Sequence, residues 1–223
     1  MRTHSKEELE KMTPSDALKI LKEGNSRFVA NLGRDHDHLQ MVNETREGQF
    51  PFAIVLSCID SRTSAEFIFD QGLGDIFSVR IAGNVLNDDI IGSMEFACAV
   101  MNSKLIVVLG HTSCGAIKGA CNEYQLGHLS SLLGKARRAV HQARNENLIN
   151  ENDPRFVDHV AKLHVHNVTD EILMRSPILD QLYNEGKIGI VGGMYNLENG
   201  EVKFTDERIP ATAKKDDANK LSA

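Results

Sequence analysis

Two short segments of this 223-residue chain combine side chains that bind metals. The first is Cys58-Ile59-Asp60-Ser61-Arg62, and the second is His111-Thr112-Ser113-Cys114. Together they offer two thiolates and one imidazole. Such donors favour zinc over magnesium or calcium, and three protein ligands leave the fourth tetrahedral position open to water, as catalytic zinc sites do. The residue types therefore predict a catalytic zinc site formed by Cys58, His111 and Cys114.

Each segment directly follows an apolar run of strand length, at 52–57 and 105–110. Continuous apolar runs are typical of parallel strands that are buried on both faces. In open α/β sheets, binding sites form outside the carboxyl ends of the strands. We therefore expect the three ligands to meet at one edge of a sheet, although they lie far apart in the sequence.

Asp60 and Arg62 lie two residues apart, so on an extended segment their side chains point to the same side. An exposed ion pair would contribute little to stability. We expect instead a buried pair beside the metal. In that pair Arg62 keeps Asp60 ionised, and Asp60 accepts a proton from water on the zinc.

Three other functions for these cysteines and histidines fit the sequence less well than a zinc site. A cysteine phosphatase needs a Cys-x5-Arg loop, whereas Cys58 and Arg62 have three residues between them. No Cys-x-x-Cys pair occurs, which argues against a redox role. His164 and His166 have ligand spacing for a strand, but their segment has a helical pattern, in which these two positions diverge.

The composition favours a globular domain with a small-molecule site. Apolar residues make up 41% of the chain and the formal net charge is −6, which argues against nucleic acid as the main partner. No apolar run approaches the ~18 residues that suggest a membrane span, and the polar segment 1–10 does not resemble a secretory signal. We expect the protein to be in the cytoplasm, and an organellar matrix is the alternative location. Both are reducing environments, in which the four cysteines are free or bind metal.

Strand-like and helix-like segments alternate along the chain, which predicts an α/β fold with a mainly parallel sheet. We expect one domain over 1–210 and a mobile polar tail over 211–223. Ser15 could cap the first helix and Gly33 could end it, and 34–48 has the pattern of a loop. The expected helices are 14–32, 64–69, 88–101, 116–124, 129–145, 155–175 and 178–184, and the expected strands are 52–57, 77–81, 105–110, 188–195 and 202–204.

The pairing of Cys58-x-Asp60-x-Arg62 with His111-x-x-Cys114 resembles the signature of the β-class carbonic anhydrases. The blocks 69–75, 79–84 and 111–117 and the late glycine-rich strand are also similar to that family, so the resemblance covers roughly Ser15 to Phe204. It implies a mainly parallel central sheet with an antiparallel extension, flanked by helices, and an N-terminal helical arm that grips a partner subunit. It also implies one zinc per chain and a homodimer as the minimal unit, with a tetramer plausible.

The family has two forms, and the resemblance favours the open, plant-like one. The regulated form has a tryptophan three residues before the first cysteine, where this chain has Val55, and the chain contains no tryptophan. Gln49 matches the glutamine that donates to substrate in the open form. Phe96 stands where that form has a tyrosine. The implied substrate-binding residues are Gln49, Phe77, Ala82, Gly83, Phe96 and Gly115.

The implied activity is the reversible hydration of carbon dioxide to bicarbonate and a proton, a lyase reaction. Zinc lowers the pKa of bound water to about 7, which provides hydroxide near neutral pH, and Asp60 and Arg62 orient it. Two alternatives remain open from the sequence. One is a hydrolase of carbonyl sulfide or carbon disulfide on the same scaffold, and the other is a non-catalytic zinc-binding interaction protein.

Overall fold

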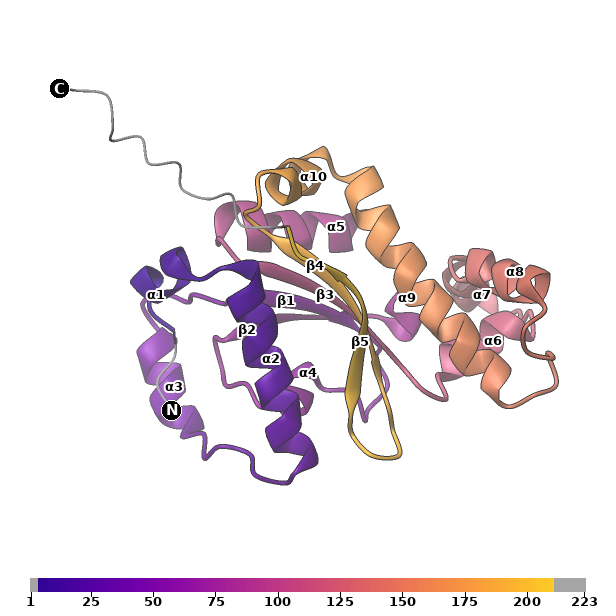
Figure 1. Ribbon diagram of the computed structural model, residues 1–223, viewed down its shortest axis with the longest axis horizontal. Coiled ribbons are helices and arrows are strands. Elements are labelled where there is room, and N and C mark those ends of the chain that lie inside the picture. Colours follow the sequence, from indigo (N-terminus) through magenta and orange to yellow (C-terminus); the bar gives the residue numbers. More distant parts are fainter. Residues whose placement is uncertain (1–3, 211–223) are drawn as a thin grey trace.

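The structure, a computed structural model, describes residues 4–210 and consists of a five-stranded sheet between two layers of helices (Figure 1). The sheet order is β2-β1-β3-β4-β5. The first four strands pair in parallel and β5 pairs antiparallel to β4, so the predicted fold class is confirmed. The tail predicted over 211–223 lies outside the described residues. The strands are β1 (Ala53–Ser57), β2 (Ile76–Arg80), β3 (Leu105–His111), β4 (Gly189–Tyr195) and β5 (Val202–Arg208).

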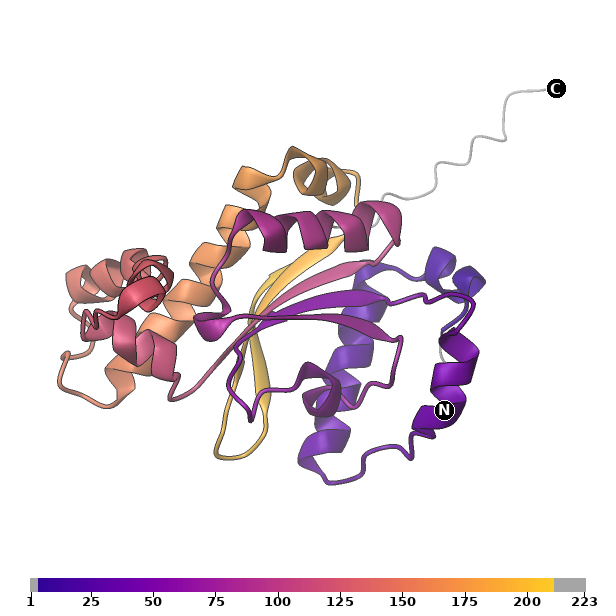
Figure 2. The same cartoon turned by 180° about the vertical axis from the view of Figure 1, so that it is seen from behind.

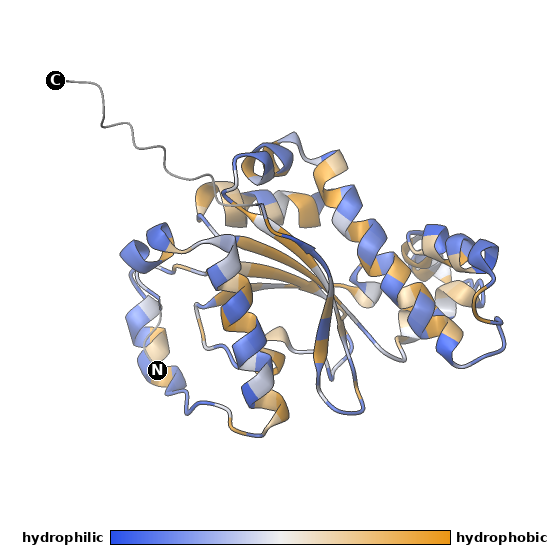
Figure 3. Cartoon of the chain, viewed as in Figure 1, coloured by the Kyte–Doolittle hydropathy of each residue, from blue (hydrophilic) through white to orange (hydrophobic). Residues whose placement is uncertain are grey.

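The three inner strands are buried at every residue, whereas the edge strands β2 and β5 alternate in burial. Figure 3 shows the inner strands as a largely hydrophobic band between the helical layers. This is the pattern of a parallel sheet that is covered on both faces. Gly110 lies in β3 where a Cβ atom would be 2.7 Å from Val165, so the absence of a side chain lets a helix pack closely on the strand.

The helices that follow β2 in the chain either cover one face of the sheet or pack against the long helix that does. The longest of them, α9 (Arg155–Arg175), packs on β3 and β4 and runs from α10 toward the group of α6, α7 and α8 (Figure 2). Its predicted bounds are confirmed. The others are α5 (Asp88–Glu95), which continues as a π-helix (Phe96–Val100), α6 (Gly115–Cys121), α7 (Gly127–Gly134), α8 (Arg137–Glu146) and α10 (Pro177–Asn184).

The other face is covered by the N-terminal helices together with α4. Leu18 and Leu21 of α2 are 5% and 0% exposed and belong to the same buried cluster as Val55 and Val107 of the sheet. The buried face of α2 therefore packs on the sheet of its own chain, and the grip of the N-terminal helices on a partner subunit stays a prediction. The helices are α1 (Lys6–Lys11), α2 (Pro14–Val29), α3 (His38–Thr45) and α4 (Ala65–Ile68).

Several predicted boundaries in the N-terminal region are wrong. Thr13, not Ser15, caps α2, because Pro14 occupies the first helical position and the cap must precede it. The helix ends at Val29, and Asn31 has a left-handed φ of 53°, so the chain turns before Gly33. The predicted loop 34–48 contains α3, capped by Asp37.

Among the other elements, two differ most from their predicted lengths. The helix expected over 129–145 is divided into α7 and α8, and the first of these ends at Gly134, a residue of low helix propensity. Strand β5 extends to Arg208 rather than Phe204 because its polar residues alternate along a half-exposed edge. None of the helices within residues 4–210 has both the length and the apolar character needed to cross a membrane.

Candidate metal centre

The sheet brings the three predicted metal ligands together. Cys58 directly follows β1, His111 is the last residue of β3, and Cys114 precedes the first residue of α6. The parallel register pairs Ser57 with Leu109, so the two strands end side by side. The two sulfur atoms and a ring nitrogen of His111 lie within 4.8 Å of one another, and all three residues are buried.

The imidazole of His111 is oriented for metal binding. Its Nδ1 lies 2.9 Å from the carbonyl oxygen of Thr112, and because a carbonyl only accepts hydrogen bonds, Nδ1 carries the proton. The lone pair is then on Nε2, which is buried and has no hydrogen-bond partner among residues 4–210. A buried polar atom without a partner is costly. An imidazole fixed by a carbonyl on one nitrogen and free on the other is typical of a metal ligand.

The two thiols are electrostatically coupled. A hydrogen bond with the Cys114 thiol, helped by the backbone N–H of Gly83, lowers the pKa of Cys58 to about 4 against the opposing effect of burial. The same contact and burial raise the pKa of Cys114. The pair therefore shares one negative charge, and a divalent cation would displace the remaining proton because coordinating thiols lose theirs. The donor set fits zinc.

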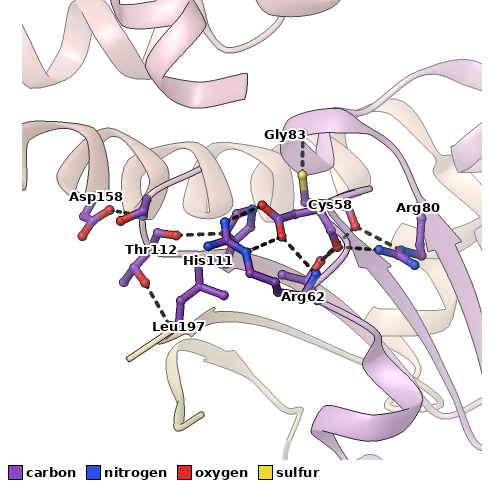
Figure 4. A network of polar contacts seen from close by, with 11 residues as sticks. Cys58, Arg62, Arg80, Gly83, His111, Thr112, Asp158 and Leu197 are labelled. Carbon is purple, nitrogen blue, oxygen red and sulfur yellow. Dashed lines mark hydrogen bonds and ion pairs between the residues drawn. The ribbon is translucent and has the colours of Figure 1, made fainter. Parts of the chain in front are cut away.

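Backbone contacts fix the segment that carries Cys58 (Figure 4). The backbone N–H of Gly83 lies 3.3 Å from Cys58 Sγ. Arg80, at the end of β2, donates from Nε to the carbonyl of Cys58 at 3.1 Å and from Nη2 to the carbonyl of Asp60 at 2.6 Å. Sequence reasoning noted the block 79–84 but assigned Arg80 no role.

Separate contacts fix the segment that carries His111 and Cys114. Ser113, between the ligands, has a left-handed φ of 54°. Its N–H donates to Asp158 Oδ1 at 2.7 Å, and Thr112 Oγ1 accepts from the N–H of Leu197 at 3.0 Å (Figure 4). Asp158 and Leu197 were missed because no local sequence pattern links them to a segment so far away.

Asp60 and Arg62 form the predicted ion pair, but the pair is not buried. Arg62 donates from Nε and Nη2 to the two carboxylate oxygens at 2.9 and 2.8 Å, and from its backbone N–H at 3.0 Å. The side chain of Arg62 is 57% exposed and that of Asp60 is 18% exposed. The segment is a turn closed by the N–H of Thr63 rather than an extended strand. The bidentate bond holds the pKa of Asp60 well below its usual range.

An open pocket of about 510 Å³ lies beside the ligands. Of the predicted substrate-binding residues, Ala82 and Gly115 line it together with Cys58 and Asp60, and Gly83 contacts the Cys58 sulfur. The far wall comes from α6, α7 and the segment between them, and these residues were not identified from the sequence. They include Lys118, Tyr124, Leu129 and Leu133.

Three predicted substrate-binding residues do not reach this pocket within one chain. Phe77 and Phe96 have ring centres 6.3 Å apart and line a different pocket of about 570 Å³. Phe77 is paired with Ile54, four residues before Cys58 on β1, or about 13 Å along a strand. Gln49 lines a third pocket, at the start of β1, whereas Cys58 follows its end.

Comparisons with known proteins agree with this architecture. The family described as carbonic anhydrase matches residues 53–202. Carbonic anhydrase 2 of Mycobacterium tuberculosis is 41% identical over 197 residues, which cover 86% of this chain and 93% of that protein. The β-carbonic anhydrase CafA of Aspergillus fumigatus superposes with a TM-score of 0.68 and 26% identity over 86% of this chain and 90% of that one.

A tetrameric β-carbonic anhydrase of Sordaria macrospora superposes with a TM-score of 0.69 at 24% identity, covering 76% of this chain and 87% of that one. That level of identity supports the fold alone. The family match, by contrast, covers the strands and both ligand-bearing segments. The chain therefore belongs to the carbonic anhydrase family, and its fold is that of the β-class.

Proposed function

We propose that the protein catalyses the reversible hydration of carbon dioxide to bicarbonate and a proton, with one zinc ion per chain held by Cys58, His111 and Cys114. The observation that carries this proposal is the buried group of two sulfurs and one unpartnered imidazole nitrogen, which opens on a pocket beside an acid. The 41% identity to a carbonic anhydrase over most of the chain supports the same reaction.

Each residue near the pocket has a distinct role in this proposal. Zinc, when bound, supplies the acidity that brings the pKa of water near 7. Asp60 accepts a hydrogen bond from the reacting water, and Arg62 keeps the carboxylate ionised and fixed in orientation. Ala82 and Leu133 offer apolar walls to a small nonpolar molecule. The N–H of Gly115, in the first turn of α6, has no acceptor within its helix and is available to a substrate oxygen.

The reaction and the metal are tested together by stopped-flow hydration of carbon dioxide and elemental analysis of zinc. We expect wild-type protein to bind one zinc per chain and to be active. Cys58→Ser should lose the metal and the activity, because it removes a thiolate ligand. Cys121→Ser is the matched control, since Cys121 is a half-buried cysteine outside the ligand group, and it should retain both. Full zinc occupancy in Cys58→Ser would contradict the ligand assignment.

Turnover of carbonyl sulfide should be measured in parallel. If the zinc-loaded protein hydrolysed carbonyl sulfide but did not hydrate carbon dioxide, the proposed reaction would be wrong while the metal site would stand. A zinc-loaded protein inactive with both substrates would favour a binding role.

Asp60→Asn should retain zinc and lose activity. The substitution keeps the size of the side chain but removes the charge, and three other residues hold the metal. We expect hydration to fall by about 10²- to 10⁴-fold, the range for a lost acid–base group. Zinc content and the rate constant should be measured on the same sample. Near-normal turnover at every pH would show that the carboxylate is dispensable.

We propose the open form of the site, in which activity follows one ionisation. The pKa of Asp60 is held well below its usual range by Arg62, so the carboxylate stays charged from alkaline through neutral pH and does not itself titrate there. Val55 cannot donate the hydrogen bond that an indole would. The rate of hydration should rise smoothly with pH. Added bicarbonate should not make the rate at neutral pH fall further. A steep, cooperative loss toward neutral pH, strengthened by bicarbonate, would indicate the regulated form.

We further propose that the protein acts as a homodimer or a higher even oligomer, and that neighbouring subunits complete each other's substrate pocket. Gln49 precedes β1 and Cys58 follows it, and the five residues of β1 between them span about 16 Å; the two residues line different pockets in one chain. Ile59, at the mouth of the metal pocket, is 59% exposed, and Phe96 is 50% exposed. Large apolar side chains left open beside both pockets are suited to contact with a second copy.

Mixed oligomers test this arrangement. Cys58→Ser loses the metal, and a Gln49→Ala/Phe77→Ala variant loses the implied substrate contacts, so each should be inactive alone. Exchanging subunits between them should restore part of the activity, because the mixed pair contains one site with both sets of residues intact. The control mixes Cys58→Ser with a chain that carries all three substitutions, which should stay inactive. If subunit exchange is demonstrated by mass and no activity returns, each site is complete within its own chain.

A further inference from the structure

His164 is a buried polar side chain in an apolar part of α9. It is 3% exposed, and its helical neighbours Ala161, Val165 and Val168 are 1% or 2% exposed. An imidazole in such surroundings is costly unless it is hydrogen-bonded. Its Nε2 lies 3.0 Å from the carbonyl oxygen of Gly83, 81 residues away in the sequence.

The direction of this hydrogen bond follows from its acceptor. A carbonyl oxygen carries no proton, so Nε2 of His164 must be the donor. Burial lowers the pKa of His164 to about 4, so the ring is neutral at neutral pH and Nδ1 carries no proton. His166, two residues on, points elsewhere and contacts Asp206 at 3.0 Å. The two histidines therefore diverge, as predicted for a helix, but only His164 faces the metal centre.

Gly83 transmits this contact to a metal ligand. Its carbonyl accepts from His164, and its N–H lies 3.3 Å from Cys58 Sγ. Its φ of 67° is left-handed, and a Cβ there would lie 3.2 Å from that of Ala116. Gly83 can thus direct its carbonyl toward His164 and its N–H toward Cys58, with no side chain of its own in the way. The bond from α9 fixes the orientation of the peptide that follows Gly83 and restrains the N–H that precedes it.

We infer that His164 is a positioning residue, which acts through Gly83 to keep a backbone hydrogen bond on the thiolate of Cys58. This inference rests on the metal centre of the proposed function but not on its substrate. Hydrogen bonds to a ligating sulfur reduce the charge that it gives to the metal, and partners of ligands typically change metal affinity by about 10- to 100-fold when they are removed. His164 touches neither the metal ligands nor the pocket, so its effect should appear in the properties of the metal.

Two substitutions separate the hydrogen bond from the packing. His164→Phe keeps a ring of similar size and removes the donor, whereas His164→Gln keeps an N–H donor on a flexible side chain. Each protein is loaded with cobalt, and the thiolate-to-cobalt charge-transfer band and the affinity in competition with a chelator are measured. We expect His164→Phe to shift the band and to weaken binding by about 10- to 100-fold, and His164→Gln to restore most of both. Should His164→Phe not fold, His164→Leu provides the same comparison.

Ile172→Ala is the control for general damage to the helix. Ile172 is 0% exposed, lies on α9 beyond His164, and makes its contacts through apolar atoms. It should lower the unfolding temperature while leaving the cobalt band unchanged. The inference is overturned if His164→Phe has the wild-type band and affinity, or if both His164 variants change only in step with their unfolding temperatures. If the cobalt differences occur in a protein that does not hydrate carbon dioxide, the proposed reaction fails and this inference stands.

Discussion

The parallel register between β1 and β3 is the constraint on which the metal centre depends. It pairs Ser57 with Leu109, so that Cys58 and His111 leave the sheet at neighbouring points on one edge. A shift of one residue would turn every side chain of one strand to the opposite face and separate the ligands. The register is itself held by burial, since every residue of both strands is buried. The chemistry therefore depends on the core that keeps these strands in place.

A buried pair of sulfurs that carries negative charge is stabilised by hydrogen-bond donors, and one of these is a backbone N–H. Gly83 directs an N–H to Cys58, while Arg80 holds the carbonyls of Cys58 and Asp60 and so keeps that turn in shape. Because backbone groups cannot change rotamer, they are well suited to a site that must exist before the metal arrives. The environment of Asp60 is different. It lies partly open to solvent, and the exposed side chain of Arg62 holds it as a charged acceptor of hydrogen bonds.

The sequence was most informative where one physical signal dominated. Uniform apolar runs predicted the inner strands, and a long amphipathic pattern between Pro154 and Pro177 predicted α9 to the residue. It failed at α3, where a single buried side chain, Met41, anchors an otherwise polar helix. At the candidate site, residue types and spacing selected the three residues whose donor atoms the fold brings together. They could not identify Arg80, Asp158 or His164, because each acts through a backbone group, and such contacts leave no pattern of side-chain types in the sequence.

The polarity of the parallel strands also explains why one chain separates residues that the family resemblance groups together. Parallel strands place their carboxyl ends on one edge of the sheet, where the metal ligands lie, and their amino ends on the other, where Gln49 and Phe77 lie. In one chain they line different pockets, because β1 lies between them. A two-fold axis can bring them together, because it sets the same surface of two copies against each other in opposite directions. In such a dimer, the proposed metal ligands of each subunit would lie beside Gln49 of the other, so the same arrangement would occur twice.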